Sequence, residues 1–166
     1  MGTLSLPSKY DPARLLLVDD EPEHVYWLVD YVKAKGFEVT LATTVAEAVA
    51  AAAETQFRGY IIDLNIPLGG WVSVFPALGE VYEKYKGLFV IKYVRTQGNK
   101  GRNVIAYSAH YNDEITSEIS VLYSDYIAKG RVEEFKSGIN EILTLPLADG
   151  AKLSSTRKGG SLPAKS

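Results

Sequence analysis

The sequence predicts an α/β protein built on a parallel sheet with helices on both faces, and two observations support this prediction. Short, continuously apolar runs alternate five times along the chain with segments whose apolar residues recur at helical spacing. Unbroken apolar runs are typical of strands buried on both faces, as in parallel sheets covered by helices. The 166 residues, of which 46% are hydrophobic and 23% charged, suffice for one domain with an ordinary core.

The first half of the chain supplies three of the expected strands. Pro22 suits the first turn of a helix and Gly36 the end of one, while Thr44 and Glu47 have the spacing of a capping box. The expected elements are a strand at 14–19 (RLLLVD), a helix from 22 to 36, a strand at 37–42, a helix opened by the capping box, and a strand at 59–63 (GYIID).

The second half continues the same alternation. The expected elements are a strand at 103–108 (NVIAYS), a helix marked by Ile115, Ile119 and Leu122, a strand at 125–129 (DYIAK), and a last helix at 132–142 that closes near Pro146. Five strand–helix units are therefore predicted.

The two ends differ from the body in composition. Residues 1–12 read as an N-terminal extension, 13–146 as the domain and 147–166 as a disordered basic tail. From Gly150 onward there are four basic residues and no acid, which leaves −6 on the rest because the whole chain carries −2. A net acidic body argues against nucleic acid as a partner.

Composition also limits the compartment and the chemistry. The sequence has no apolar run of the ~20 residues that a membrane span needs, and its start lacks the apolar segment of a signal peptide. There is no cysteine, which excludes disulfides, thiolate metal sites and cysteine nucleophiles. We therefore expect a cytoplasmic protein without membrane contact.

Polar residues stand where four of the five predicted strands end. Asp19 and Asp20 close the first strand, Asp63 the third, Ser108 the fourth and Lys129 the fifth. Ligands of such sheets gather beyond the carboxyl ends of the strands. If strands one and three are neighbours, the three aspartates converge, and their repulsion is relieved by a cation. Oxygen ligands without His or Cys suit Mg²⁺, with Mn²⁺ as an alternative.

A carboxylate beside a cation can also react. Asp63 could act as a nucleophile and form an aspartyl-phosphate. The metal would then cover one phosphoryl oxygen, Lys129 a second, and the Ser108 hydroxyl with a backbone N–H the third. The pattern thus favours phosphoryl transfer.

These residues lie in four motifs that together resemble a known family. VDDEP (18–22), IIDLNIP (61–67), AYSAH (106–110) and DYIAKG (125–130) resemble the receiver domain of two-component response regulators, in its stand-alone, chemotaxis-regulator-like form. The resemblance covers roughly residues 13 to 145. It implies a flavodoxin-like, doubly wound, five-stranded parallel sheet in the order 2-1-3-4-5.

The resemblance also implies roles for individual residues. A histidine kinase or a phosphotransfer protein would be the phosphoryl donor, and the chain would be no enzyme beyond catalysing its own phosphorylation and dephosphorylation. The implied roles are Asp63 as phosphoacceptor; Asp19, Asp20, Asp63 and the backbone carbonyl of Asn65 as metal ligands; Lys129, Ser108 and the Ala109 backbone N–H as phosphoryl-binding groups; Ser108 and Tyr126 as the switch; and Asn65 and His110 as residues that set the dephosphorylation rate.

Two features depart from the family pattern. Gly130 stands where receivers usually have a proline in a cis peptide, so we expect the Lys129–Gly130 bond to be trans. Asp63 and Ser108 are 45 positions apart, which is longer than in most receivers, and the excess lies in residues 68–87.

This insertion predicts an extra helix. Pro76 suits its first turn and Gly87 its end, and the apolar residues at helical spacing between them are Leu78, Val81, Tyr82 and Tyr85. It could be a lid, a docking surface for a partner, or a packed elaboration of the surface.

Three functions stay open at this point. The first is a receiver whose phosphorylation alters the face made by the fourth helix, the fifth strand and the last helix, with a partner protein or a homodimer through that face as output. The second is a binding module that acts through the inserted helix independently of phosphate. The third is a Mg²⁺-dependent phosphohydrolase, which commonly needs an acid two residues after the nucleophile, where Asn65 stands.

Overall fold

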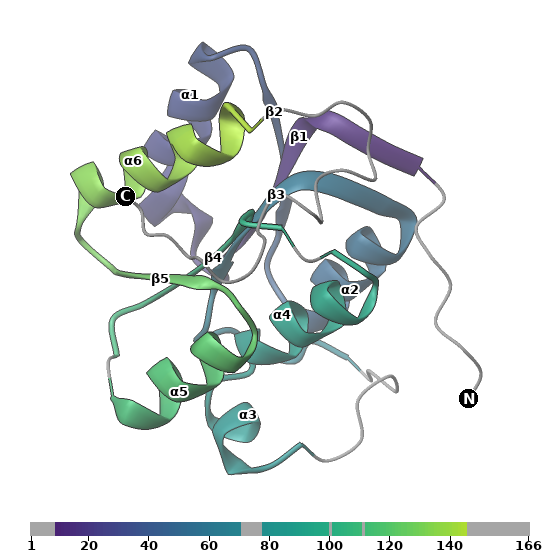
Figure 1. Ribbon diagram of the computed structural model, residues 1–166, viewed down its shortest axis with the longest axis vertical. Helices are drawn as coiled ribbons and strands as arrows, with labels where there is room; N and C mark the ends of the chain where they lie inside the picture. The colour runs from purple at the N-terminus through teal and green to yellow at the C-terminus, as the bar shows by residue number, and fades with distance from the viewer. Residues whose placement is uncertain (1–8, 71–77, 100, 111, 146–166) are drawn as a thin grey trace.

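Five parallel strands form one sheet in the order β2-β1-β3-β4-β5 (Figure 1). The structure is a computed structural model that describes residues 9–70, 78–99, 101–110 and 112–145. The strands are β1 (Lys9–Val18), β2 (Glu38–Ala42), β3 (Thr55–Asp63), β4 (Val104–Ser108) and β5 (Asp125–Ala128). The predicted fold class and strand order are confirmed.

Helices cover both faces of this sheet. They are the 3₁₀ helix η1 (Pro22–Val25), α1 (Tyr26–Ala34), α2 (Val45–Glu54), α3 (Glu80–Lys84), α4 (Gly87–Thr96), α5 (Asp113–Val121) and α6 (Val132–Leu143). Helices α1 and α6 pack on one face and α2, α4 and α5 on the other. No helix in these described stretches is long and apolar enough to cross a membrane.

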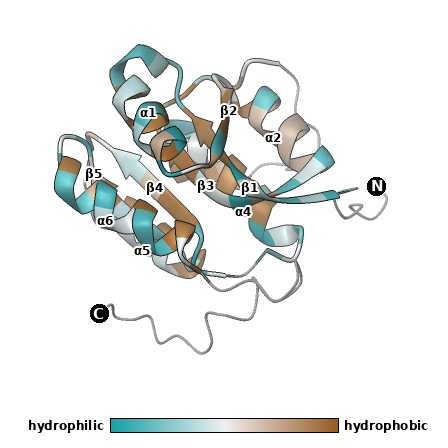
Figure 2. Cartoon of the chain, turned by 90° about the horizontal axis from the view of Figure 1, so that it is seen from above, coloured by the Kyte–Doolittle hydropathy of each residue, from teal (hydrophilic) through white to brown (hydrophobic). Residues whose placement is uncertain are grey.

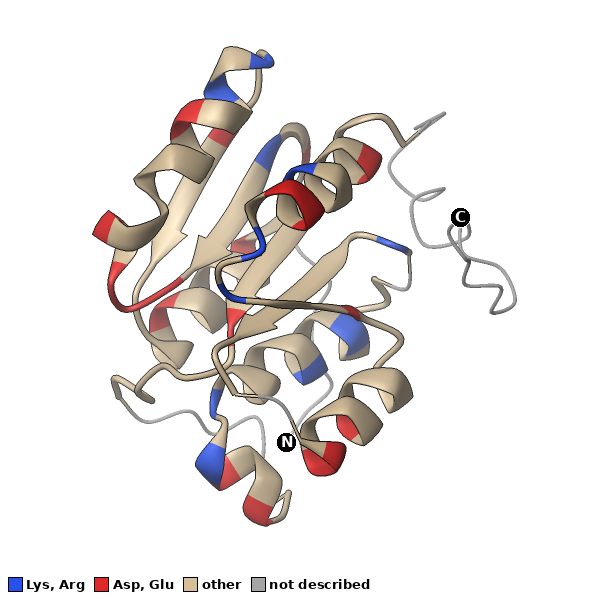
Figure 3. Ribbon diagram, turned by 90° about the vertical axis from the view of Figure 1, so that its left-hand side faces the viewer, with Lys and Arg blue, Asp and Glu red and all other residues tan. Residues whose placement is uncertain are grey.

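The alternation of side chains along each strand explains why both faces are covered. In β1, Leu15 and Leu17 enter the core under α1 and α6, while Leu16 and Val18 enter the core under α2 and α4. All four are at most 1% exposed. In Figure 2 the strands are brown in the interior of the sheet, whereas the start of β1 and the outer surfaces of the helices are largely teal. Acidic and basic residues are interspersed over the helices (Figure 3).

The capping box predicted at the start of the second helix is present. The Thr44 hydroxyl caps α2 by accepting the Glu47 N–H at 3.0 Å, as the capping box predicts. The Glu47 carboxylate returns to the Thr43 N–H at 2.7 Å, one residue before the expected position. The short polar segment before α2 is therefore fixed at the end of the sheet that carries the polar strand ends.

Two strands begin earlier than predicted. The first starts at Lys9 rather than Arg14, and the third at Thr55 rather than Gly59. Residues 9–11 pair with residues 55–57, so residues assigned to the N-terminal extension belong to the sheet. These stretches are too polar to show an apolar run. They form strands through hydrogen bonds between their backbones. The Arg58 side chain also links β3 to β1 by donating to the carbonyl of Pro12.

The insertion after β3 contains the predicted extra helix, in shorter form. Helix α3 spans Glu80–Lys84, and Pro76 lies outside the described residues, as do Pro146 and the predicted tail. Gly87 does not end this helix but begins α4, which corrects the prediction. Its N–H donates to the Leu64 carbonyl at 3.0 Å, and a Cβ there would lie 2.3 Å from the Asp63 carbonyl oxygen. Glycine is thus required for close approach to β3 rather than for stopping a helix.

Candidate functional site

Three carboxylates meet at the carboxyl ends of β1 and β3. Register pairs Val18 with Ile62, so the residues that follow lie side by side. One oxygen from each of Asp19, Asp20 and Asp63 lies within 4.8 Å of the others. Asp19 and Asp63 are each 1% exposed, whereas Asp20 is exposed to solvent. The expected convergence of the three aspartates is therefore present.

The Asp63 carboxylate is held by two donors. The Asn65 backbone N–H donates to Oδ1 at 2.9 Å, and the Lys129 ammonium donates to Oδ2 at 2.9 Å. Burial raises the pKa of Asp63 to about 6, although both donors lower it. One oxygen of the buried Asp63 carboxylate is thus paired with a cation that follows the edge strand β5.

Lys129 reaches this position although no proline follows it. Gly130 has φ +94°, a left-handed conformation that proline, fixed near −65°, cannot adopt. The described residues contain no cis peptide bond, so the expected trans Lys129–Gly130 bond is confirmed. Partial burial lowers the pKa of Lys129, but its hydrogen bond to Asp63 and the surrounding carboxylates outweigh this and raise that pKa.

The loop after β4 connects Ser108 with Tyr126. Ser108 is fully buried, and its hydroxyl oxygen accepts the His110 N–H at 2.9 Å. The Tyr126 hydroxyl on β5 donates to the His110 carbonyl at 2.7 Å. Ala109, between Ser108 and His110, is exposed. The serine and the tyrosine expected to form the switch therefore bind the same residue, Ser108 at the backbone N–H of His110 and Tyr126 at its carbonyl.

The inserted segment contacts this loop as well. The His110 ring lies 5.9 Å from the Tyr85 ring, centroid to centroid. The Tyr85 hydroxyl accepts a hydrogen bond from the Asn112 side chain at 3.2 Å, and Asn112 also caps α5. Asn65 and His110, the residues expected to set dephosphorylation, are both exposed. The sequence did not indicate that His110 packs against the insertion.

One residue of the site was missed by the sequence reading. Tyr107 was not among the residues expected at the site, but it is 1% exposed and donates its hydroxyl to the Asp19 carboxylate. Burial first, and then the charge of Asp19, raise the pKa of Tyr107. Its position directly before Ser108, in a strand next to the one that ends in Asp63, is the signal that could have identified it.

The donor set fits a hard divalent cation. The cluster offers carboxylate oxygens and neither His nor Cys, which suits Mg²⁺ or Mn²⁺. Two of the three acids are buried, and among the described residues Lys129 is the cation that pairs with Asp63. The excess of negative charge at this sheet edge favours a bound cation.

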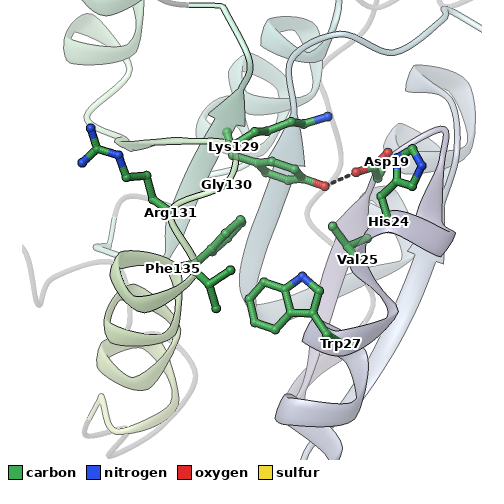
Figure 4. A pocket seen from close by; sticks show the side chains of 10 residues that line it. Asp19, His24, Val25, Trp27, Lys129, Gly130, Arg131 and Phe135 are labelled. Atoms are coloured by element: carbon green, nitrogen blue, oxygen red, sulfur yellow. Dashed lines mark hydrogen bonds between the residues drawn. The ribbon is translucent and has the colours of Figure 1, made fainter.

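A pocket of about 210 Å³ opens beside the acids (Figure 4). Apolar side chains of Val25, Trp27 and Phe135 form much of its wall. Lys129 points across it toward Asp19, whereas Arg131 points away. The pocket therefore borders the site on the α1 and α6 side.

Comparison by sequence gives short matches. No family model matches this chain. The transcriptional regulatory protein PrrA of Mycobacterium leprae is 38% identical over 65 residues, and that of Mycobacterium tuberculosis 37% over 65 residues. Each match covers 39% of this chain and only 28% of the relative.

Comparison by structure covers most of the chain. The HemR receiver domain of Leptospira biflexa superposes with a TM-score of 0.62 at 18% identity, over 80% of this chain and 95% of the other. Vibrio cholerae chemotaxis protein CheY4 gives 0.59 at 19% identity, over 78% and 98%. The Thermotoga maritima response regulator TrrA, solved in complex with Mg²⁺–BeF, gives 0.56 at 21%, over 78% and 97%. The chain has the fold of CheY-like response regulator receivers, which confirms the resemblance expected from its motifs.

Proposed function

We propose that this chain is a phospho-accepting receiver of a two-component phosphorelay in the cytoplasm, in which Mg²⁺-dependent phosphorylation of Asp63 switches a partner-binding surface. The observation that carries the proposal is the environment of Asp63. It is a buried carboxylate paired with Lys129 at 2.9 Å and within 4.8 Å of two further aspartates. The donor would be a histidine kinase or a phosphotransfer protein.

The residues of the cluster divide the work of phosphoryl transfer. Asp19, Asp20, Asp63 and the Asn65 carbonyl would hold Mg²⁺, which when bound neutralises charge on the phosphoryl oxygens. An Asp63 oxygen would bond to the donor's phosphorus as the P–N bond to the donor histidine breaks and that imidazole takes up a proton. The Lys129 ammonium already lies against the accepting carboxylate. It would pair with an oxygen of the incoming phosphoryl group and stabilise its negative charge.

The loop of residues 108–110 would transmit phosphorylation of Asp63 to the surface of the protein. The Ser108 hydroxyl now accepts the His110 N–H, and with the Ala109 N–H it would turn to the phosphoryl oxygens. That movement displaces the His110 carbonyl to which Tyr126 donates, and so changes the face made by α5, β5 and α6. The output is a partner protein bound to this face, or a homodimer through it.

Two exposed residues would set how long the phosphoryl group persists. Asn65 is two positions after Asp63, and His110 is two positions after Ser108. We assign both to controlling water access to the acyl phosphate.

The contacts of the inserted helix α3 favour a role linked to the proposed output face over a role that is independent of phosphorylation. The Tyr82 hydroxyl donates to Glu118 of α5, and Lys84 lies 3.9 Å from Glu114 of the same helix. A partner that bound α3 would therefore touch an element attached to the proposed output face. Phosphohydrolase activity is not favoured, because Asn65 offers an amide where a general acid would be needed.

The switch can be tested with beryllofluoride, a mimic of the phosphoryl group. With Mg²⁺ and beryllofluoride, ¹H–¹⁵N spectra of the full chain should show shifts at residues 108–112 and at Tyr126. The Asp63→Ala variant should show none of these. Identical spectra of the native chain with and without beryllofluoride would contradict the proposal.

A further inference from the structure

A phenol hydroxyl is buried against one of the acids of the proposed cation site. Tyr107 stands on β4, and its hydroxyl donates to Oδ2 of Asp19, marked by the dashed line in Figure 4. Both side chains are 1% exposed, so water does not compete for this hydrogen bond. Tyr107 and Asp19 are 88 positions apart in sequence, and the contact joins the ends of strands that are not adjacent in the sheet.

The orientation of the Asp19 carboxylate is fixed at both oxygens. The Glu21 backbone N–H donates to Oδ1 at 2.8 Å, while Tyr107 donates to Oδ2. These donors come from different parts of the chain, one from the turn that enters η1 and one from β4. Together they set the carboxylate plane, and each oxygen keeps a lone pair for a cation.

The tyrosine ring is itself held in place. It packs against Phe135 of α6 with ring centroids 5.0 Å apart and an angle of 63° between planes. The Lys129 ammonium also lies over this ring, 5.2 Å from its centroid. These contacts hold the ring in the orientation that places its hydroxyl against Asp19.

We propose that Tyr107 is a positioning residue that acts through Asp19 to give the site a preference for Mg²⁺ over Ca²⁺. This inference rests on the proposed function insofar as that function places a cation here. Mg²⁺ requires near-ideal octahedral geometry, whereas Ca²⁺ accepts varied ligand arrangements. Hydrogen bonds that orient ligating carboxylates commonly contribute about 10–100-fold to metal affinity. A carboxylate locked by Tyr107 therefore favours the ion with the stricter geometry.

The test compares Tyr107→Phe with the native chain by calorimetric titration with MgCl₂ and, separately, CaCl₂. Tyr107→Phe removes one oxygen atom and keeps the ring that packs on Phe135. Mg²⁺ affinity should fall about 10-fold, and Ca²⁺ affinity clearly less. Tyr31→Phe is the matched control, since it removes a hydroxyl that donates to Asn140 between α1 and α6. It should bind both ions as the native chain does.

Three outcomes would overturn the inference. They are Mg²⁺ affinity unchanged in Tyr107→Phe, equal losses for Mg²⁺ and Ca²⁺ as expected of a purely structural residue, and no cation binding by the native chain. If Tyr107→Phe does not fold, near-ultraviolet circular dichroism of the native chain replaces it. Saturation with Mg²⁺ should change the tyrosine signal, and no change would contradict a bond between Tyr107 and a ligand.

Failure of this inference can be distinguished from failure of the proposed function. A native chain that is phosphorylated on Asp63, with Tyr107→Phe unaltered in cation binding, removes the role of Tyr107 alone. A native chain that binds Mg²⁺ with the expected Tyr107 effect, but accepts no phosphoryl group, removes the receiver function alone.

Discussion

The Lys129 ammonium and the Asp63 carboxylate form an ion pair of 2.9 Å between the ends of β5 and β3, with β4 between them. The carboxylate side chain is 2% exposed and the lysine side chain 36%. The pair therefore joins a buried acceptor to a cation that solvent and an incoming donor can reach.

Replacement of Lys129 should slow phosphorylation of Asp63. Lys129→Ala removes the side-chain cation that would stabilise charge on the transferred phosphoryl group, so the rate with a small phosphodonor should fall about 10-fold or more. The rate is measured by mass spectrometry over time. Lys136→Ala, on the α6 surface over the Tyr31 ring, is the control and should react as the native chain does. Equal rates for the native chain and Lys129→Ala would contradict the assigned role.

The raised pKa of Asp63 predicts how stability depends on pH without metal. Its pKa is about 6 in the folded chain and 3.8 when unperturbed, so protonation stabilises the fold. This contribution is full below pH 3.8 and is lost as pH rises through about 6. Asp63→Asn should therefore gain stability relative to the native chain across that window, by on the order of 1–3 kcal/mol.

Urea unfolding in the presence of a chelator measures this difference. Both chains are compared at several pH values between 4 and 7.5, so that other titrating groups cancel in the difference. A stability difference between the two chains that does not change over this range would show that Asp63 is not desolvated as described.

Gly87 should not tolerate a side chain. A Cβ at this position would lie 2.3 Å from the Asp63 carbonyl oxygen and 2.6 Å from the Leu64 Cα, both of them backbone atoms. Gly87→Ala should lower the free energy of unfolding by about 1–3 kcal/mol, as overpacking does. In Gly138→Ala the nearest atoms are ends of the Ile105 and Ile127 side chains at 3.1 and 3.3 Å, and these can shift. Thermal melting of both variants should show a clear loss for Gly87→Ala alone.

The fold could be predicted from the sequence because its strands are apolar runs, and most of the site could be predicted because its residues stand where those strands end. Apolar runs located the strands, and Asp19, Asp63, Ser108 and Lys129 were found because a parallel sheet brings its carboxyl ends together. The early part of β1 was missed because its pairing with β3 uses backbone groups of polar residues. The role of Gly87 was misjudged because close approach between distant backbones leaves no local pattern. Tyr107 was missed because its partner is 88 positions away.

His110 should affect how fast the phosphoryl group is lost. Its ring rests on Tyr85 of the inserted segment, and its backbone bonds to both Ser108 and Tyr126. His110→Ala removes the ring and keeps these backbone bonds, so water should reach the acyl phosphate more easily and phosphate loss should be faster. Phosphate release from the phosphorylated chain measures this rate. Lys136→Ala, on the α6 surface over the Tyr31 ring, is again the control. Equal rates for His110→Ala and the native chain would contradict the assignment.

The central claim is that Asp63 accepts a phosphoryl group in a Mg²⁺-dependent reaction, and intact mass measurement tests it most directly. The native chain and Asp63→Ala are each incubated with acetyl phosphate and Mg²⁺, and again with a chelator in place of Mg²⁺. We predict a gain of one phosphoryl group in the native chain with Mg²⁺ and in none of the other three samples. No gain in the native chain, or an equal gain in Asp63→Ala, would contradict the claim.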